Sequence, residues 1–177
     1  MLSEKGILSE ADIDGLGQTF RESSDPVAQR LAFSKLIQGL TADNALLIRE
    51  HIEHKDHRSA EFQEFHYAWG AIGGTEAVMF GVDTVEPDMQ PALSGWASSD
   101  PQKAIAWFEA LDMENDSSFD PLLKDRKMKA DDLRNHLMGG LVQGLADTDP
   151  DLAVEFVQGV LESGNRAAYG MMHAPIS

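Results

Sequence analysis

Cysteine is absent from this chain of 177 residues, and that absence removes several kinds of chemistry at once. Disulfide bonds, thiolate zinc sites and a cysteine nucleophile are all excluded. The compartment stays open, because a reducing cytosol and a disulfide-free periplasmic protein both accommodate a chain without cysteine. We expect a cytoplasmic protein by default, since the first residues lack the basic and apolar regions of a signal peptide. An extracytoplasmic location is the alternative if a leader was trimmed.

Long apolar runs and basic residues are also scarce. No run reaches the roughly 18 apolar residues of a membrane span, so we expect no membrane insertion. Lysine and arginine together number 14 against 30 aspartates and glutamates, which gives a formal net charge of −16. A phosphate backbone or an anionic lipid surface requires a positively charged face. The sequence therefore predicts no nucleic-acid partner and favours, at most, basic partners or cations.

Sequence motifs typical of catalytic sites are also absent. The chain has no Gly-x-Ser-x-Gly elbow, no Ser-x-x-Lys pair, no phosphate-binding loop and no EF-hand. His66 stands among aromatic neighbours, which indicates a half-buried packing residue rather than a general base. We therefore expect no enzymatic activity. The alternative is an enzyme whose catalytic groups converge only in the folded chain.

The sequence shows helical periodicity along most of its length. Apolar residues recur at helical spacing, and no strand-like alternation of useful length occurs, so we predict an all-α fold. The length suits a single domain over residues 1–177. Asp-Pro pairs mark several helix starts, because aspartate caps the first turn and proline fits the first helical position. We expect a marginal helix over 9–21 and an irregular polar insertion over 112–132.

One Asp-Pro stretch recurs almost position for position. It contains a glycine and a large apolar residue before the turn, then the Asp-Pro pair, an alanine and an aromatic residue. The first copy is Gly95, Trp96, Asp100, Pro101, Ala104 and Trp107, and the second is Gly144, Leu145, Asp149, Pro150, Ala153 and Phe156. The small residue before the anchor is expected to let two helices approach near the turn.

Two further copies are weaker. Placing Trp69 on the first anchor aligns Ala77 and Phe80, with Gly73-Gly74 in place of Asp-Pro, and a fourth copy begins at Gly39-Leu40. We predict a short right-handed solenoid of about four stacked antiparallel helix pairs. The repeat units are expected at residues 26–56, 59–83, 88–112 and 131–163.

The pattern resembles a class of bacterial tandem α-helical repeat proteins whose repeats carry a Trp-Ala-x-x-Asp-Pro-x-x-Ala-x-x-Trp type of signature. These proteins are similar to tetratricopeptide or HEAT-like helix-pair arrays. The resemblance implies a helical solenoid that acts as a scaffold for protein–protein interaction, with a protein or peptide partner. The class supplies no catalytic residues to carry over, and we expect no cofactor.

A histidine cluster supports an alternative function. Three of the six histidines, His51, His54 and His57, fall within seven residues. On a helix their spacing places neighbouring imidazoles and carboxylates on one face, which can hold Zn²⁺ or another transition ion. The chain would then be a metal- or ligand-binding sensor. The competing interpretation is a solvated helix C-terminus, where histidine is favoured by the helix dipole.

Overall fold

The structure is a computed structural model that describes residues 7–56, 58–83 and 88–173, with side chains described as far as residue 162 except at residue 83. Every regular element in these ranges is helical, so the all-α prediction is confirmed for the described chain. None of the helices in these ranges is long and apolar enough to cross a membrane.

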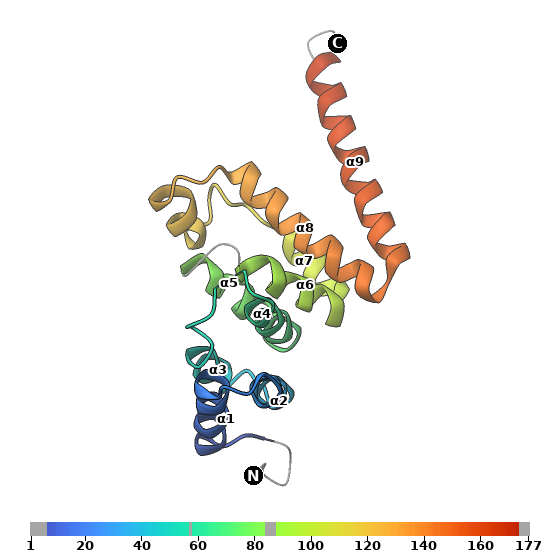
Figure 1. The fold of residues 1–177 in the computed structure, drawn as a ribbon. Coiled ribbons are helices and arrows are strands. Elements are labelled where there is room, and N and C mark those ends of the chain that lie inside the picture. The colour runs from blue at the N-terminus through green and yellow to red at the C-terminus, as the bar shows by residue number, and fades with distance from the viewer. Residues whose placement is uncertain (1–6, 57, 84–87, 174–177) are drawn as a thin grey trace.

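Three helices form the N-terminal end of the molecule (Figure 1). They are α1 (Glu10–Glu22), α2 (Pro26–Gln38) and α3 (Ala45–Glu50). Both α2 and α3 pack against α1. Ser9 caps α1 by accepting a hydrogen bond from the Asp12 N–H, and the Asp12 carboxylate accepts one from the Ser9 N–H in return. This capping box starts α1 one residue after the predicted position.

The rest of the chain alternates longer and shorter helices as far as the last one. These elements are α4 (Ala60–Gly73), α5 (Thr75–Asp83), α6 (Met89–Ser99), α7 (Pro101–Glu109), α8 (Ala130–Thr148) and α9 (Pro150–His173). Helix α6 packs against α4 on one side and against α8 on the other. The later turns of α9 project away from this body and form the opposite end of the molecule (Figure 1).

The Asp-Pro pairs start helices as the sequence predicts. The Asp25 carboxylate accepts a hydrogen bond from the Val27 N–H at 3.0 Å, and proline follows at the first position of α2. Where Asp-Pro is replaced by two glycines, the chain turns at Gly74 with φ 59°. A residue with a side chain is strained at this φ, so glycine is required there.

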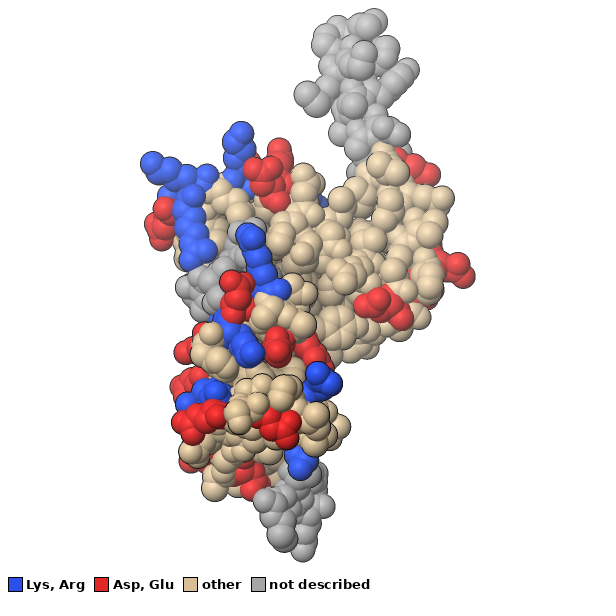
Figure 2. Space-filling view, viewed as in Figure 1, with Lys and Arg blue, Asp and Glu red and all other residues tan. Residues whose placement is uncertain are grey.

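The polar segment between α7 and α8 is irregular but anchored. It contains a short 3₁₀ turn at Ser117–Phe119 and a π-helical turn at Pro121–Asp125. Phe119 and Leu122 are buried in the core, so burial of apolar surface fixes this segment to the body. On the face shown in Figure 2, Lys and Arg side chains gather at this part of the molecule.

Candidate functional site

The turn between α6 and α7 has the same geometry as the turn between α8 and α9. Asp100 has φ −144° and ψ 76°, and Asp149 has φ −144° and ψ 85°. The Asp100 N–H donates to the Trp96 carbonyl at 2.8 Å, and the Asp149 N–H donates to the Leu145 carbonyl at 2.7 Å. Equivalent sequence positions therefore build equivalent turns.

The contact between α4 and α6 also recurs between α6 and α8. A Cβ added at Gly95 would collide with the main-chain carbonyl of Tyr67, and one added at Gly144 would collide with that of Ser94. Tyr67 and Ser94 occupy the same position in their respective copies, two residues before the apolar anchor. Each glycine thus allows its helix to lie directly against the backbone of the preceding long helix.

Two side-chain hydroxyl groups make equivalent hydrogen bonds at the C-terminal ends of α6 and α8. The Ser99 Oγ donates to the Ala71 carbonyl at 2.8 Å, which ties α6 to α4. The Thr148 Oγ1 donates to the Ser98 carbonyl, also at 2.8 Å, which ties α8 to α6. Both donors lie three residues after the apolar anchor and both acceptors lie two residues after it. The three long helices α4, α6 and α8 are therefore joined by one recurring set of contacts.

Aromatic pairs link α4 to α5 and α6 to α7. The ring centroids of Trp69 and Phe80 are 5.1 Å apart, and those of Trp96 and Trp107 are 5.7 Å apart. The equivalent alanines on α5, α7 and α9 are buried, namely Ala77, Ala104 and Ala153. These are the anchor and crossing positions that the sequence pattern picks out.

A polar groove of about 600 Å³ lies across these three helices. Gln63 and Tyr67 line it from α4, Gln90 and Ser94 from α6, and Gln143 from α8. Gln63 and Gln90 occupy equivalent positions of two copies, and so do Tyr67, Ser94 and Gln143. Because the helices stack through one recurring contact, equivalent residues are brought to one face.

Hydrogen bonds orient the groove side chains. The Gln90 Nε2 donates to the His136 carbonyl at 3.1 Å, and the Gln63 Nε2 donates to the Arg58 carbonyl at 3.1 Å. The Tyr67 hydroxyl lies 3.4 Å from a carboxylate oxygen of Asp147 and so reaches from α4 to α8.

The formal charges of Arg58 and Glu64, which line the groove, cancel. Arg58 contributes one positive charge and Glu64 one negative charge, in a chain whose formal net charge is −16. The arrangement suits hydrogen bonding to a polar, weakly charged ligand. No sequence motif identifies Gln63, Gln90 or Gln143. The signal that could have identified them is that they occupy positions that recur in the aligned copies.

A buried charge cluster joins the N-terminal helices to the long helices. The Arg49 guanidinium, on α3, lies 3.1 Å from the Asp88 carboxylate, just before α6. The His66 Nε2, on α4, lies 3.4 Å from the Arg49 Nε and 3.6 Å from the same carboxylate. The guanidinium also lies over the Phe80 ring, 4.8 Å from its centroid. His66 is fully buried rather than half-buried as predicted, and it packs against Phe65.

The predicted metal cluster is only partly within the described residues, because His57 lies outside them. Helix α3 ends at Glu50, so His51 and His54 lie in the turns that follow rather than on a helix as expected. Both are directed toward α1, where the His51 Nε2 lies 3.1 Å from an Asp14 carboxylate oxygen.

The His54 ring contacts Phe20, with centroids 5.4 Å apart. Burial lowers the pKa of His54 below its ordinary value, and the nearby charges of Lys55 and Arg21 lower it further. Among the residues that the structure describes, no group of three or more histidine, aspartate or glutamate side chains is placed to hold a metal ion. The His51, His54 and His57 site remains a prediction.

Comparison of the chain with protein-family models, with curated proteins and with solved structures finds no match.

Proposed function

We propose that this chain is a non-enzymatic helical-repeat module, a short right-handed solenoid, that binds a protein or peptide segment in the polar groove across α4, α6 and α8. The observation that carries the proposal is the recurring glycine–carbonyl contact at Gly95 and Gly144. Helices stacked by one repeated step form an extended surface of the kind that solenoid proteins use for binding.

The chemistry of the groove favours a peptide backbone as its ligand. A glutamine side chain carries both a carbonyl acceptor and N–H donors, which are the two groups that a peptide bond presents. Gln63, Gln90 and Gln143 place such amides on the stacked helices α4, α6 and α8. Because the lining is nearly neutral, we expect recognition by hydrogen bonding to an extended segment rather than by charge.

The proposal is tested by selecting 12-residue peptides from a random display library on the full chain and measuring their dissociation constants. The groove variant is Gln63→Ala with Gln143→Ala. The matched control is Gln18→Ala with Gln158→Ala, which removes two exposed glutamines from α1 and α9. We expect the groove variant to weaken binding by at least about tenfold, which corresponds to 1.4 kcal/mol.

The control variant is expected to bind as the unmodified chain does. Equal loss in both variants, or no loss in the groove variant, would contradict the assignment of the groove. Failure to select any peptide of this length would contradict peptide binding itself.

A further inference from the structure

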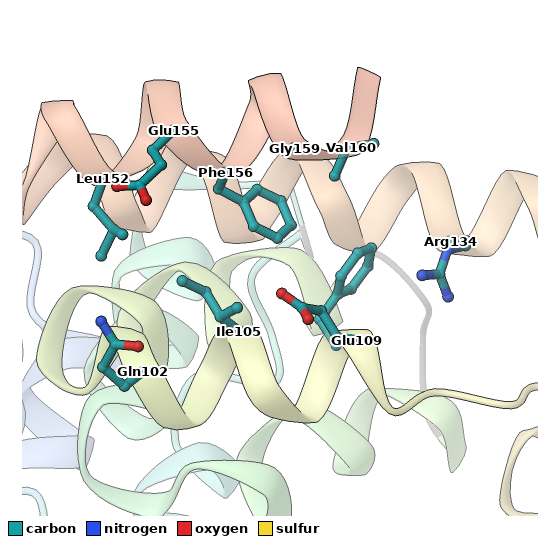
Figure 3. A pocket seen from close by; sticks show the side chains of 10 residues that line it. Gln102, Ile105, Glu109, Arg134, Leu152, Glu155, Phe156, Gly159 and Val160 are labelled. Atoms are coloured by element: carbon teal, nitrogen blue, oxygen red, sulfur yellow. The ribbon is translucent and has the colours of Figure 1, made fainter. Parts of the chain in front are cut away.

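A second groove lies on a different part of the molecule, between α7 and α9. Its volume is about 810 Å³, and α8 contributes Arg134 to its lining. Figure 3 shows Phe156 and Leu152 directed from α9 toward α7, with Ile105 facing them from α7. None of these residues lines the polar groove, so the second groove is a separate surface.

The floor of this second groove is apolar. Phe108 and Phe156 are buried and their ring centroids are 5.9 Å apart, while Ile105, Leu152 and Val160 remain partly exposed along the sides. Gly159 adds open space on α9, because a Cβ placed there meets no heavy atom within 4 Å. An exposed apolar groove of this kind accommodates the apolar face of a helix.

The rim of the groove is charged. Glu109 and Glu155 stand on opposite walls, and Arg134 lies at one end, with its guanidinium 4.6 Å from the Phe108 ring centroid. The described side chains of α9 include three acidic residues and no lysine or arginine; the acidic residues are Asp151, Glu155 and Glu162. On the face shown in Figure 2, separate acidic side chains lie on the surface formed by the first turns of α9.

We propose that the α7–α9 groove binds an amphipathic helix of a partner protein, with its apolar side chains on Phe108 and Phe156 and its basic side chains beside Glu109 and Glu155. Charge complementarity is the reason for proposing a basic partner helix rather than a second copy of this chain. A second copy of this chain would bring another net charge of −16 to an acidic rim, so it is disfavoured by repulsion. The inference does not depend on the polar groove or on the function proposed for it.

The test uses the full chain and three synthetic peptides of equal length. The probe is an 18-residue peptide of leucine and lysine with leucine at helical spacing. One comparison peptide has the same composition in scrambled order, and the other replaces each lysine by glutamate. We expect the leucine–lysine helix to bind at least about tenfold more tightly than either comparison peptide in fluorescence anisotropy.

Two variants locate the binding. Gly159→Leu fills the groove, and its matched control, Gly15→Leu, makes the same change in α1, where a Cβ also meets nothing within 4 Å. Glu109→Gln with Glu155→Gln removes the rim charges, and Glu50→Gln with Glu76→Gln removes the same charge elsewhere. We expect each groove variant to lose binding and each control to retain it.

Several results would overturn the proposal. Equal affinity for the scrambled peptide would show nonspecific attraction to an acidic chain. Equal loss in Gly159→Leu and Gly15→Leu would place the peptide elsewhere. A dimer in sedimentation that Gly159→Leu dissociates would assign the groove to a second copy. Each of these results leaves the test of the polar groove unaffected, because that test uses other peptides and other residues.

Discussion

Glycines meet different neighbours in the two regions of this molecule. In the long helices, Gly95 and Gly144 each lie against a main-chain carbonyl of the preceding helix. In the N-terminal region, Gly17 lies against the His51 side chain and Gly39 against the Leu8 side chain. A backbone carbonyl held in a helix is fixed in place, whereas a side chain has other rotamers. The same small residue therefore fixes a helix stack in one region and only accommodates a side chain in the other.

This difference means that the N-terminal copy of the predicted sequence repeat lies outside the helix stack. Gly39-Leu40 aligns with Gly95-Trp96, yet α2 packs mainly against α1 rather than joining the stack of α4, α6 and α8. Asn44, at the capping position of this copy, makes no side-chain cap to α3 and instead accepts from the Thr41 N–H at 2.7 Å. The N-terminal copy thus shares the pattern of residues but not the contacts.

The largest effect is expected where the two regions are joined. Asp88→Asn removes the buried carboxylate beside the Arg49 guanidinium and leaves only the exposed Glu53 carboxylate as its ionic partner. Removing one member of a buried pair costs about 3–5 kcal/mol of unfolding free energy. Urea denaturation followed by circular dichroism measures the loss. The control is Lys124→Met, which breaks the exposed pair with Asp120 and should cost about 1 kcal/mol or less. Similar losses in both variants would contradict the structural role of the cluster.

A smaller effect distinguishes the glycines of the two regions. Gly95→Ala inserts a methyl group against the Tyr67 carbonyl, and overpacking of this kind costs about 1–3 kcal/mol. Gly39→Ala meets the Leu8 side chain, which can move aside, so its cost should be lower. Both are measured by the midpoint of urea denaturation. A larger loss for Gly39→Ala would remove the distinction drawn between the regions.

The equivalent turns should respond equally to loss of their caps. Asp100→Ala and Asp149→Ala each remove a carboxylate that accepts from the first helical turn, and such a change costs about 1 kcal/mol. Thermal unfolding of the two variants should therefore give similar shifts in Tm. A shift confined to one of them would show that the two turns are not energetically equivalent.

The smallest effect concerns His54 in the N-terminal region. Its folded pKa lies below the ordinary value of 6.5, chiefly because burial disfavours the charged imidazole. The unfolded chain therefore binds the proton more readily, and stability should fall slightly as the pH drops through 6.5. We expect His54→Gln to reduce this fall in Tm between neutral and mildly acidic pH. An unchanged pH dependence would contradict the assignment.

The sequence predicts well those features of the fold that depend only on neighbouring residues, such as helix starts. Asp100 and Pro101 determine a helix start among their own neighbours, so the cap was predictable without knowledge of the fold. The ion pair between Arg49 and Asp88 spans 39 residues of sequence, and no local pattern connects the two. The expectation that His51 and His54 lie on a helix is wrong because α3 ends at Glu50, although the polar residues after it keep a helix-compatible composition.

The candidate sites depend on tertiary packing to a greater degree. The repeat alignment identifies which glycines are equivalent, but the carbonyl that each one meets is set by the crossing of two helices. Gln63 and Gln143 come together only because α4 and α8 flank α6. The groove between α7 and α9 brings together Phe108 and Phe156, which the sequence indicates only as separate apolar positions.

The recurring glycine contact is tested most directly by the same substitution at two glycines of adjacent helices. Gly144→Ala places a methyl group against the Ser94 carbonyl, whereas Gly159→Ala places one in open space. Alanine favours a helix over glycine by about 1 kcal/mol, so propensity alone would stabilise both variants. We predict stability changes of opposite sign in urea denaturation, with Gly144→Ala less stable and Gly159→Ala more stable than the unmodified chain. Stabilisation of both would contradict close stacking of α8 on α6.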